Sequence, residues 1–339
     1  MKVDIFMVIV KAIFSNFLAF LMSFILTVLP SAPLRAPVIE TLESDCLLNI
    51  EVLSDTHIES KSPLRKAMLR GGLKNISKAK SPVDAVIVTG DITNYADEPS
   101  LAVFYDILNK NATVPVIPVA GNHDIGHAGD RDVTDISREE ALANFIGYRN
   151  EYMGRNDSVN YFSTEINGFK FIILGDEVID GGHWDGISMS AEQLDFLDSE
   201  LADGTKGGKP VLVFCHWPIK GINGESTIYP DSGIDPDEYD VKGIMEKYRN
   251  VYYISGHMHA GIRAKTAADM FSLCCAEQVN GVTYINLPTY GLVNMFGLPC
   301  PGIGAQIEVY KNEVVFRPRN FITNKWITSA EYHFDLLSH

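Results

Sequence analysis

Apolar residues in this chain gather into short runs, and the pattern within each run predicts the strands. Residues 84–89, 114–120, 210–215 and 251–255 are apolar almost throughout. Continuous apolar runs of about four to eight residues are typical of strands that are buried on both faces. Residues 47–53 alternate between apolar and polar positions, which predicts a first strand with two different faces. We therefore expect a β-sheet with a buried centre.

Longer segments of mixed polarity lie between these runs and predict helices. Ser137 with Glu140, and Ser190 with Gln193, have the spacing of a capping box, which marks the first turn of a helix. Strands that alternate with helices favour α/β units with parallel strands. The helices that the sequence predicts cover residues 61–80, 99–109, 137–152 and 190–201.

The second half of the chain adds strands of another kind. Residues 159–163 and 169–174 flank Asn167-Gly168, a dipeptide that favours a tight hairpin turn and therefore an antiparallel pair. The sequence has no repeat and no clear boundary after the first strand, so residues 47–339 are expected to form one domain. Further strands are expected at residues 283–286, 305–310 and 313–317.

The N-terminal segment has the pattern of a targeting sequence rather than of part of a folded domain. Residues 5–29 are almost wholly apolar, with Lys2 and Lys11 near their start. A signal peptide needs an apolar middle of roughly 7–15 residues and a small-residue cleavage site, whereas an anchor needs roughly 20 apolar residues. The segment fits both, and its poor cleavage site favours an anchor. We expect residues 1–30 to be a signal peptide or membrane anchor, followed by a linker over residues 31–46.

This segment also predicts where the protein acts. With either a cleaved signal peptide or a retained anchor, the domain is expected outside the cytoplasmic membrane, secreted or membrane-anchored. The five cysteines are odd in number and have no CxxC spacing, so they predict neither a zinc knuckle nor a disulfide framework.

Composition narrows the class of partner. The chain has 339 residues, of which 46% are hydrophobic, and this supports a large folded core. Its net charge of −15 argues against a nucleic-acid polymer as the partner, because few basic residues remain to neutralise phosphates. The negative charge is explained either by an acidic surface that keeps the protein soluble or by the binding of cations.

Polar residues that could bind a metal follow five of the predicted strands. Ligand sites of open α/β sheets lie outside the carboxyl ends of the strands, so these residues are expected to converge. Each piece alone has an ordinary explanation, such as a turn or a hydrogen-bonded core histidine, but their joint occurrence at strand ends does not. In chain order the residues are Asp55 and His57, then Asp91, then Asn122, His123 and Asp124, then His216, then His257 and His259.

The order D-x-H, G-D, G-N-H-D, H, G-H-x-H resembles that of the calcineurin-like metallophosphoesterase superfamily. The resemblance covers about residues 48–290, and every motif is intact. It implies an α/β (α+β) fold, a four-layer α/β/β/α sandwich in which two mixed sheets are flanked by helices. It also implies two metal ions, and a hydrolase that cleaves phosphate esters with a metal-bridging hydroxide as nucleophile. Imidazole, carboxylate and amide ligands suit Mn, Fe or Zn better than the oxygen cages of Ca.

The resemblance also implies a role for each motif residue. His123 would reach the substrate and its leaving group, and Asp124 would orient His123. The metal ligands form two sets that share one carboxylate. One ion would be held by Asp55, His57, Asp91 and His259, and the other by Asp91, Asn122, His216 and His257.

One departure narrows the subfamily. Purple acid phosphatases of this superfamily have the motifs D-x-G and G-D-x-x-Y, in which the tyrosine binds iron. Here the first motif ends in His57, and Asn94 stands three places after Asp91, with Tyr95 one place too late. An iron–tyrosinate site is therefore not expected.

A small-molecule phosphate ester is the expected substrate, with phosphodiesters favoured. A phosphomonoesterase is the alternative, and a non-catalytic metal-binding scaffold of the same fold is a further one. Residues 221–239 are rich in Gly, Pro, Ser and Asp and are expected to form a long loop that acts as a lid. Candidates for choosing the substrate lie in the loops beside the ligands, and each is explained equally well as an ordinary surface residue. They are Asn94, Tyr95, His127, Arg131, His183 and Trp184.

Overall fold

The architecture comes from a computed structural model of the chain. It describes residues 45–79, 81–128, 131–132, 135–179, 186–225, 232–259, 276–291 and 301–337. The predicted signal peptide or anchor, and the linker except for its last two residues, lie outside this described part. Within the described ranges, no helix is both long and apolar enough to span a membrane.

The first of two large sheets is mixed and contains the strand predicted at residues 47–53. Among the described residues it has seven strands, in the order β14-β13-β12-β1-β2-β3, with β15 paired to β13. β1, β2 and β3 are parallel to one another, whereas β12 runs antiparallel to β1. Their bounds are β1 Leu48–Leu53, β2 Ala85–Thr89, β3 Val116–Val119, β12 Ile303–Val309, β13 Glu313–Asn320, β14 Lys325–Trp326 and β15 Tyr332–Asp335.

The second sheet is also mixed. Its six described strands have the order β10-β11-β9-β8-β7-β6. The four central strands are parallel, and the hairpin predicted across Asn167-Gly168 is confirmed as the antiparallel pair of β6 and β7. Their bounds are β6 Phe162–Ile166, β7 Phe169–Ile173, β8 Val211–Phe214, β9 Val251–Ser255, β10 Ala276–Val279 and β11 Val282–Asn286, and a separate small ribbon joins β4 His127–Ala128 to β5 Arg131–Asp132.

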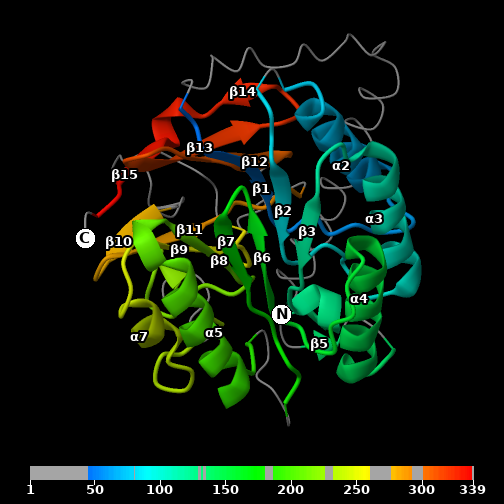
Figure 1. Cartoon of the computed structure of the whole chain (residues 1–339). Coiled ribbons are helices and arrows are strands. Elements are labelled where there is room, and N and C mark those ends of the chain that lie inside the picture. Colours follow the sequence, from blue (N-terminus) through cyan, green and yellow to red (C-terminus); the bar gives the residue numbers. More distant parts are fainter. Residues whose placement is uncertain are drawn as a thin grey trace, which may run out of the picture.

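Helices cover the outer faces of both sheets (Figure 1). The four predicted helices are confirmed with small shifts of their ends, and the Ser137 and Ser190 hydroxyls accept hydrogen bonds from the backbone N–H of Glu140 and Gln193. α2, α3 and α4 lie along the first sheet, and α5 and α7 along the second. Their bounds are α2 Pro63–Ile76, α3 Glu98–Asn111, α4 Arg138–Met153, α5 Ala191–Gly204 and α7 Val241–Met245.

Alternation along the buried strands divides the interior into three cores. In β2, Ile87 faces the second sheet, whereas Val86 and Val88 face the helices. In β8, Phe214 faces the first sheet and Val213 faces α5 and α7. Successive side chains of a strand point to opposite faces, so each sheet packs on both sides. These three cores confirm the predicted four-layer sandwich.

Candidate metal centre

The loops after β1, β2, β3, β8 and β9 meet at one edge of the two sheets. Backbone hydrogen bonds join the first two loops, because Asp55 N donates to Gly90 O at 3.0 Å and His57 N donates to Asp91 O at 2.8 Å. Gly256 N donates to His216 O at 2.9 Å in the same way. The parallel strands thus bring the predicted ligands together, as expected for the carboxyl ends of such strands.

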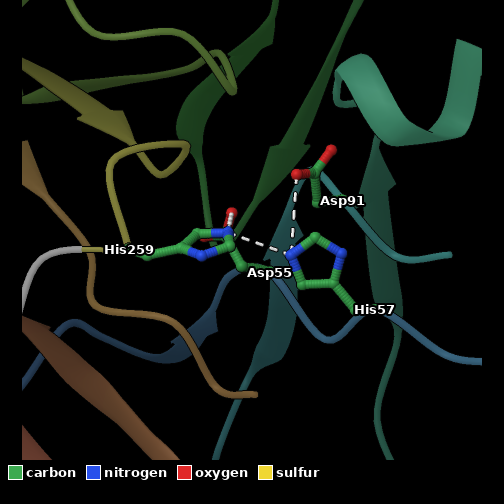
Figure 2. A group of neighbouring side chains, drawn as sticks. All are labelled: Asp55, His57, Asp91 and His259. Carbon is green, nitrogen blue, oxygen red and sulfur yellow. Dashed lines mark hydrogen bonds and ion pairs between the residues drawn. The ribbon is translucent and has the colours of Figure 1, made fainter. Parts of the chain in front are cut away.

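One group of ligands comprises Asp55, His57, Asp91 and His259. Their ligand atoms all lie within 4.8 Å of one another, and Figure 2 shows the side chains converging. His259 Nε2 lies 3.1 Å from Asp55 Oδ1 and 2.9 Å from His57 Nε2. His57 Nε2 lies 3.7 Å from Asp91 Oδ2. We call this set the first ligand group.

A second ligand group comprises Asp91, Asn122, His216 and His257. Asn122 Oδ1 lies 3.1 Å from His216 Nε2 and 3.0 Å from His257 Nδ1. Asp91 Oδ2, which belongs to the first group, lies 3.4 Å from His216 Nε2. The other ring nitrogen of His216 lies 2.9 Å from the Thr89 carbonyl oxygen, and such a contact fixes the tautomer that leaves Nε2 for a metal.

The chemistry of these residues fits a metal ion. Asp55 is fully buried, its Oδ1 lies 3.1 Å from His259 Nε2, and its Oδ2 has no hydrogen-bond partner among the described residues. A buried carboxylate with so few donors is costly unless a cation compensates it. With four imidazoles and two further oxygen ligands nearby, this is the donor set of a divalent metal centre.

Glycines make room for the cluster. A Cβ on Gly90 would lie 2.1 Å from His216 Nδ1, and a Cβ on Gly121 would lie 2.3 Å from Asp91 Oδ1. Gly90 also has a φ of +81°, a value that L side chains rarely adopt. The glycines of the G-D and G-N-H-D motifs therefore let the ligand side chains approach the neighbouring backbone.

Burial and charge act against each other in the centre. Burial lowers the pKa of His57 and His257 well below the ordinary histidine value, which favours the neutral imidazole that a metal needs. Burial also acts to lower the pKa of His216, but the carboxylates of Asp91 and Asp55 raise it to about 9. Burial acts to raise the pKa of Asp91, and the surrounding histidines hold it well below its usual range.

Five of the ligands have a strained backbone. Left-handed φ values, from 44° to 69°, occur at Asp55, His57, Asp91, His257 and His259. Non-glycine residues seldom adopt this region, and such strain gathers at functional sites. The ligand loops are thus held in conformations that the hydrogen bonds between them must maintain.

The structure corrects the predicted pairing of Asp124 with His123. Within the described part of the chain, the Asp124 carboxylate accepts hydrogen bonds from the backbone N–H of Ile92, Thr93 and Gly121 at 2.7–3.0 Å, and from the Thr93 hydroxyl at 2.8 Å. Burial, followed by the charge of Asp91, raises the pKa of Asp124 to about 7. Asp124 therefore ties the loops after β2 and β3 together.

A different group holds His123. Its Nδ1 lies 2.9 Å from the carbonyl oxygen of Asn94, and its backbone N–H donates to Asp91 Oδ1 at 2.9 Å. Its half-buried ring lies 4.6 Å from the ring of His57, in an edge-to-face arrangement. The His123 ring thus lies beside the first ligand group.

The structure describes two of the residues that were candidates for contacting the substrate, and the side chains of the other four lie outside the described part. The Asn94 side chain donates to Glu59 Oε1 at 2.9 Å and is already engaged, whereas Tyr95 is 44% exposed. The side chains of His127, Arg131, His183 and Trp184 lie outside the described part, as do residues 226–231 of the predicted lid. The sequence did not single out Glu59 and Arg65 as residues of the site, because a Glu and an Arg near the start of a helix have no distinctive pattern.

Comparison with known proteins agrees with this arrangement. A family model described as calcineurin-like phosphoesterase matches residues 48–261, which include all seven predicted ligands. A solved dimetal phosphatase from Danio rerio is 14% identical, with a TM-score of 0.59, and the match covers 86% of this chain and 100% of that one. A purple acid phosphatase from yellow lupin (Lupinus luteus) seeds is 12% identical, with a TM-score of 0.52, covering 85% and 53%. No curated protein sequence matches.

Proposed function

Because this chain belongs to the calcineurin-like phosphoesterase family, we propose that it hydrolyses phosphodiesters at a centre that holds two metal ions. The class of reaction follows from the family and the site. The protein is a metal-dependent hydrolase that acts on phosphoric ester bonds, and its substrates are small phosphate esters.

The shared position of Asp91 Oδ2 carries the proposal of two ions. This one oxygen lies 3.7 Å from His57 Nε2 in the first group and 3.4 Å from His216 Nε2 in the second. A carboxylate with ligand sets on both sides is suited to bridging two cations. When bound, such a pair supplies Lewis acidity and a water ionised near neutral pH, and this donor set suits Mn, Fe or Zn.

The charge balance beside the centre supports a diester. Arg65 lies near the first group, since a Cβ on Gly291 would be 3.3 Å from Asp55 O and 3.9 Å from Arg65 Nη1, but Arg65 Nε is 3.3 Å from Glu59 Oε1. A monoester dianion carries one more negative charge than a diester and benefits more from an unpaired cation. Since Glu59 already neutralises Arg65, the described surroundings favour the singly charged diester.

His123 is proposed to protonate the leaving group. With Nδ1 donating to the Asn94 carbonyl, Nε2 is the ring nitrogen left for substrate. As the oxygen of the attacking water forms its bond to phosphorus and the bond between phosphorus and the leaving oxygen breaks, the electron pair of the broken bond stays on the leaving oxygen, and the proton of Nε2 moves to it. General-acid help of this kind contributes roughly 10²–10⁴-fold to the rate.

A comparison of two aryl esters tests the function. The domain, loaded with Mn or Zn and analysed for metal content, would be given a bis-aryl and a mono-aryl phosphate in parallel. We expect a higher kcat/KM for the diester. Equal or reversed preference would contradict the diester assignment and favour a phosphomonoesterase. A metal-loaded protein that cleaves neither ester, nor any in a wider panel, would be a non-catalytic scaffold.

The location is a separate proposal that rests on the sequence of residues 1–30. We propose that this segment places the domain outside the cytoplasmic membrane, as a secreted or anchored protein. Protease treatment of intact cells tests this, because an external domain is digested and an internal one is protected.

A further inference from the structure

A chain of three contacts leads from His123 to the start of helix α2. His123 Nδ1 lies 2.9 Å from the Asn94 carbonyl oxygen, and Asn94 Nδ2 donates to Glu59 Oε1 at 2.9 Å. The same Glu59 oxygen lies 3.3 Å from Arg65 Nε, in the first turn of α2. Glu59 and Arg65 side chains are 25% and 20% exposed, so this ion pair is only partly open to solvent.

The Asn94 carbonyl is the single acceptor that the described residues offer to the His123 ring. Its own position is fixed from two sides. Asn94 N donates to Ile58 O at 3.2 Å, and the preceding Thr93 N donates to Asp124. The side-chain hydrogen bond from Asn94 Nδ2 to Glu59 Oε1 is a further restraint on the same residue.

We propose that Glu59 is a positioning residue that aims the His123 ring at the leaving group, acting through Asn94. This inference rests on the proposed role of His123 as the proton donor. If the carbonyl turns, the ring loses its hydrogen bond and Nε2 no longer points at the leaving oxygen. A misplacement of about 1 Å costs on the order of 10²-fold in rate. Arg65 holds the Glu59 carboxylate in place through the 3.3 Å ion pair.

A leaving-group series separates this role from a merely structural one. Methyl p-nitrophenyl phosphate and dimethyl phosphate share one methyl ester and differ in the leaving group, which is p-nitrophenolate in the first and methoxide in the second. An alkoxide needs protonation far more than a nitrophenolate does. We expect Glu59→Ala to lower kcat for the methyl ester about 10- to 100-fold, within the range of general-acid effects, and to leave kcat for the nitrophenyl ester within about threefold.

Three further variants sharpen the test. Glu59→Gln keeps an acceptor for Asn94, so it should restore most of the activity on the methyl ester. Asn94→Ala breaks the same link from the other side and should reproduce the pattern of Glu59→Ala, which keeps the proposal testable if one variant folds poorly. Glu200→Ala is the matched control, because its carboxylate accepts from Lys170 at 2.9 Å with 23% exposure on helix α5.

The outcomes distinguish this inference from the function beneath it. His123→Ala should show the same leaving-group dependence, and Glu59→Ala should add nothing to it in the double variant. If His123→Ala slows both esters equally, the proposed role of His123 fails. If His123→Ala shows the dependence but Glu59→Ala slows both esters equally, or adds its full effect in the double variant, Glu59 does not position His123.

Discussion

The Nε2 atoms of His57 and His259 lie 2.9 Å apart, although the two residues are 202 positions apart in the chain. Two imidazole nitrogens at this distance need a shared proton or a cation that both can bind. Asp55 Oδ1 lies 3.1 Å from the same His259 Nε2, and Oδ2 of this fully buried carboxylate has no hydrogen-bond partner among the described residues, which favours the cation.

Metal binding should therefore stabilise the fold. Adding Zn or Mn to the metal-free protein is expected to raise the free energy of unfolding by about 2.7 kcal/mol at a hundredfold excess over Kd. Thermal unfolding with and without a chelator measures this. In His57→Ala the gain should shrink, because the first group loses a ligand. An identical melting temperature with and without metal would contradict the assignment of these residues.

The adjacent residues Asn122 and His123 should separate metal binding from catalysis. Asn122 Oδ1 contacts two ligand histidines, whereas the His123 ring contacts a backbone carbonyl. Asn122→Ala is expected to lower the metal content of the purified protein. His123→Ala should keep the full metal content and lower kcat about 10²-fold or more for a diester whose leaving group is an alkoxide. Metal analysis beside kinetics checks both, and a loss of metal from His123→Ala would show that His123 is itself a ligand.

Asp124 is expected to contribute mainly to the stability of the fold. Its buried carboxylate accepts from three backbone N–H groups and one hydroxyl among the described residues. Asp124→Asn removes the charge and turns an amide N–H₂ toward these donors, and we expect a loss of about 2–4 kcal/mol in the free energy of unfolding. Urea unfolding of the metal-free variant measures it.

An exposed aspartate provides the comparison for that experiment. Asp106 pairs with Lys110 one turn along helix α3, with 49% and 70% of the side chains exposed. Asp106→Asn should change stability by less than about 0.5 kcal/mol. If the two substitutions have equal effects, the Asp124 carboxylate does not hold the loops together.

Local pattern was enough to predict the buried parallel strands and to place the candidate ligand residues at the ends of those strands. Buried parallel strands such as β2 and β8 must be apolar on both faces, and residues that follow them converge at one edge because of topology. The pairing of Asp124 was not predictable in this way. Adjacency in sequence suggested His123 as its partner, but the turn Asn122–Ile125 points the carboxylate at the backbone of the loop after β2.

Other features of the site and the fold could not be predicted because they depend on contacts between distant loops or lack a sequence pattern. Glu59 reaches Asn94 only because the loops after β1 and β2 run side by side, joined by Ile58 N to Ile92 O at 2.8 Å. The strands β10, β14 and β15 are short or only half-buried, so they lack the apolar pattern that predicts strands. The left-handed backbone at Asp55 and His257 has no signature in residue type, since glycine is absent there.

The last strand carries a pH-dependent contribution to stability. On β15, His333 lies between Glu313 and Glu331, with each ring nitrogen 2.9 Å from a carboxylate oxygen. Hydrogen bonds to Glu313 and then Glu331 raise the pKa of His333 above its ordinary value of 6.5. The protonated form is therefore favoured in the folded state.

The sign of the effect follows from that raised pKa. The stabilisation is fully present below pH 6.5, where the unfolded chain is also protonated, and is lost as the pH rises through the folded value. Because half of the side chain is exposed, solvent screening limits the contribution to about 0.5 kcal/mol. We expect His333→Gln to be less stable than the wild type by that amount at pH 5.5 and equally stable at pH 9, in urea unfolding of the metal-free proteins. A difference that is the same at both values of pH would mean that packing of the ring, and not its charge, holds β15 against β13.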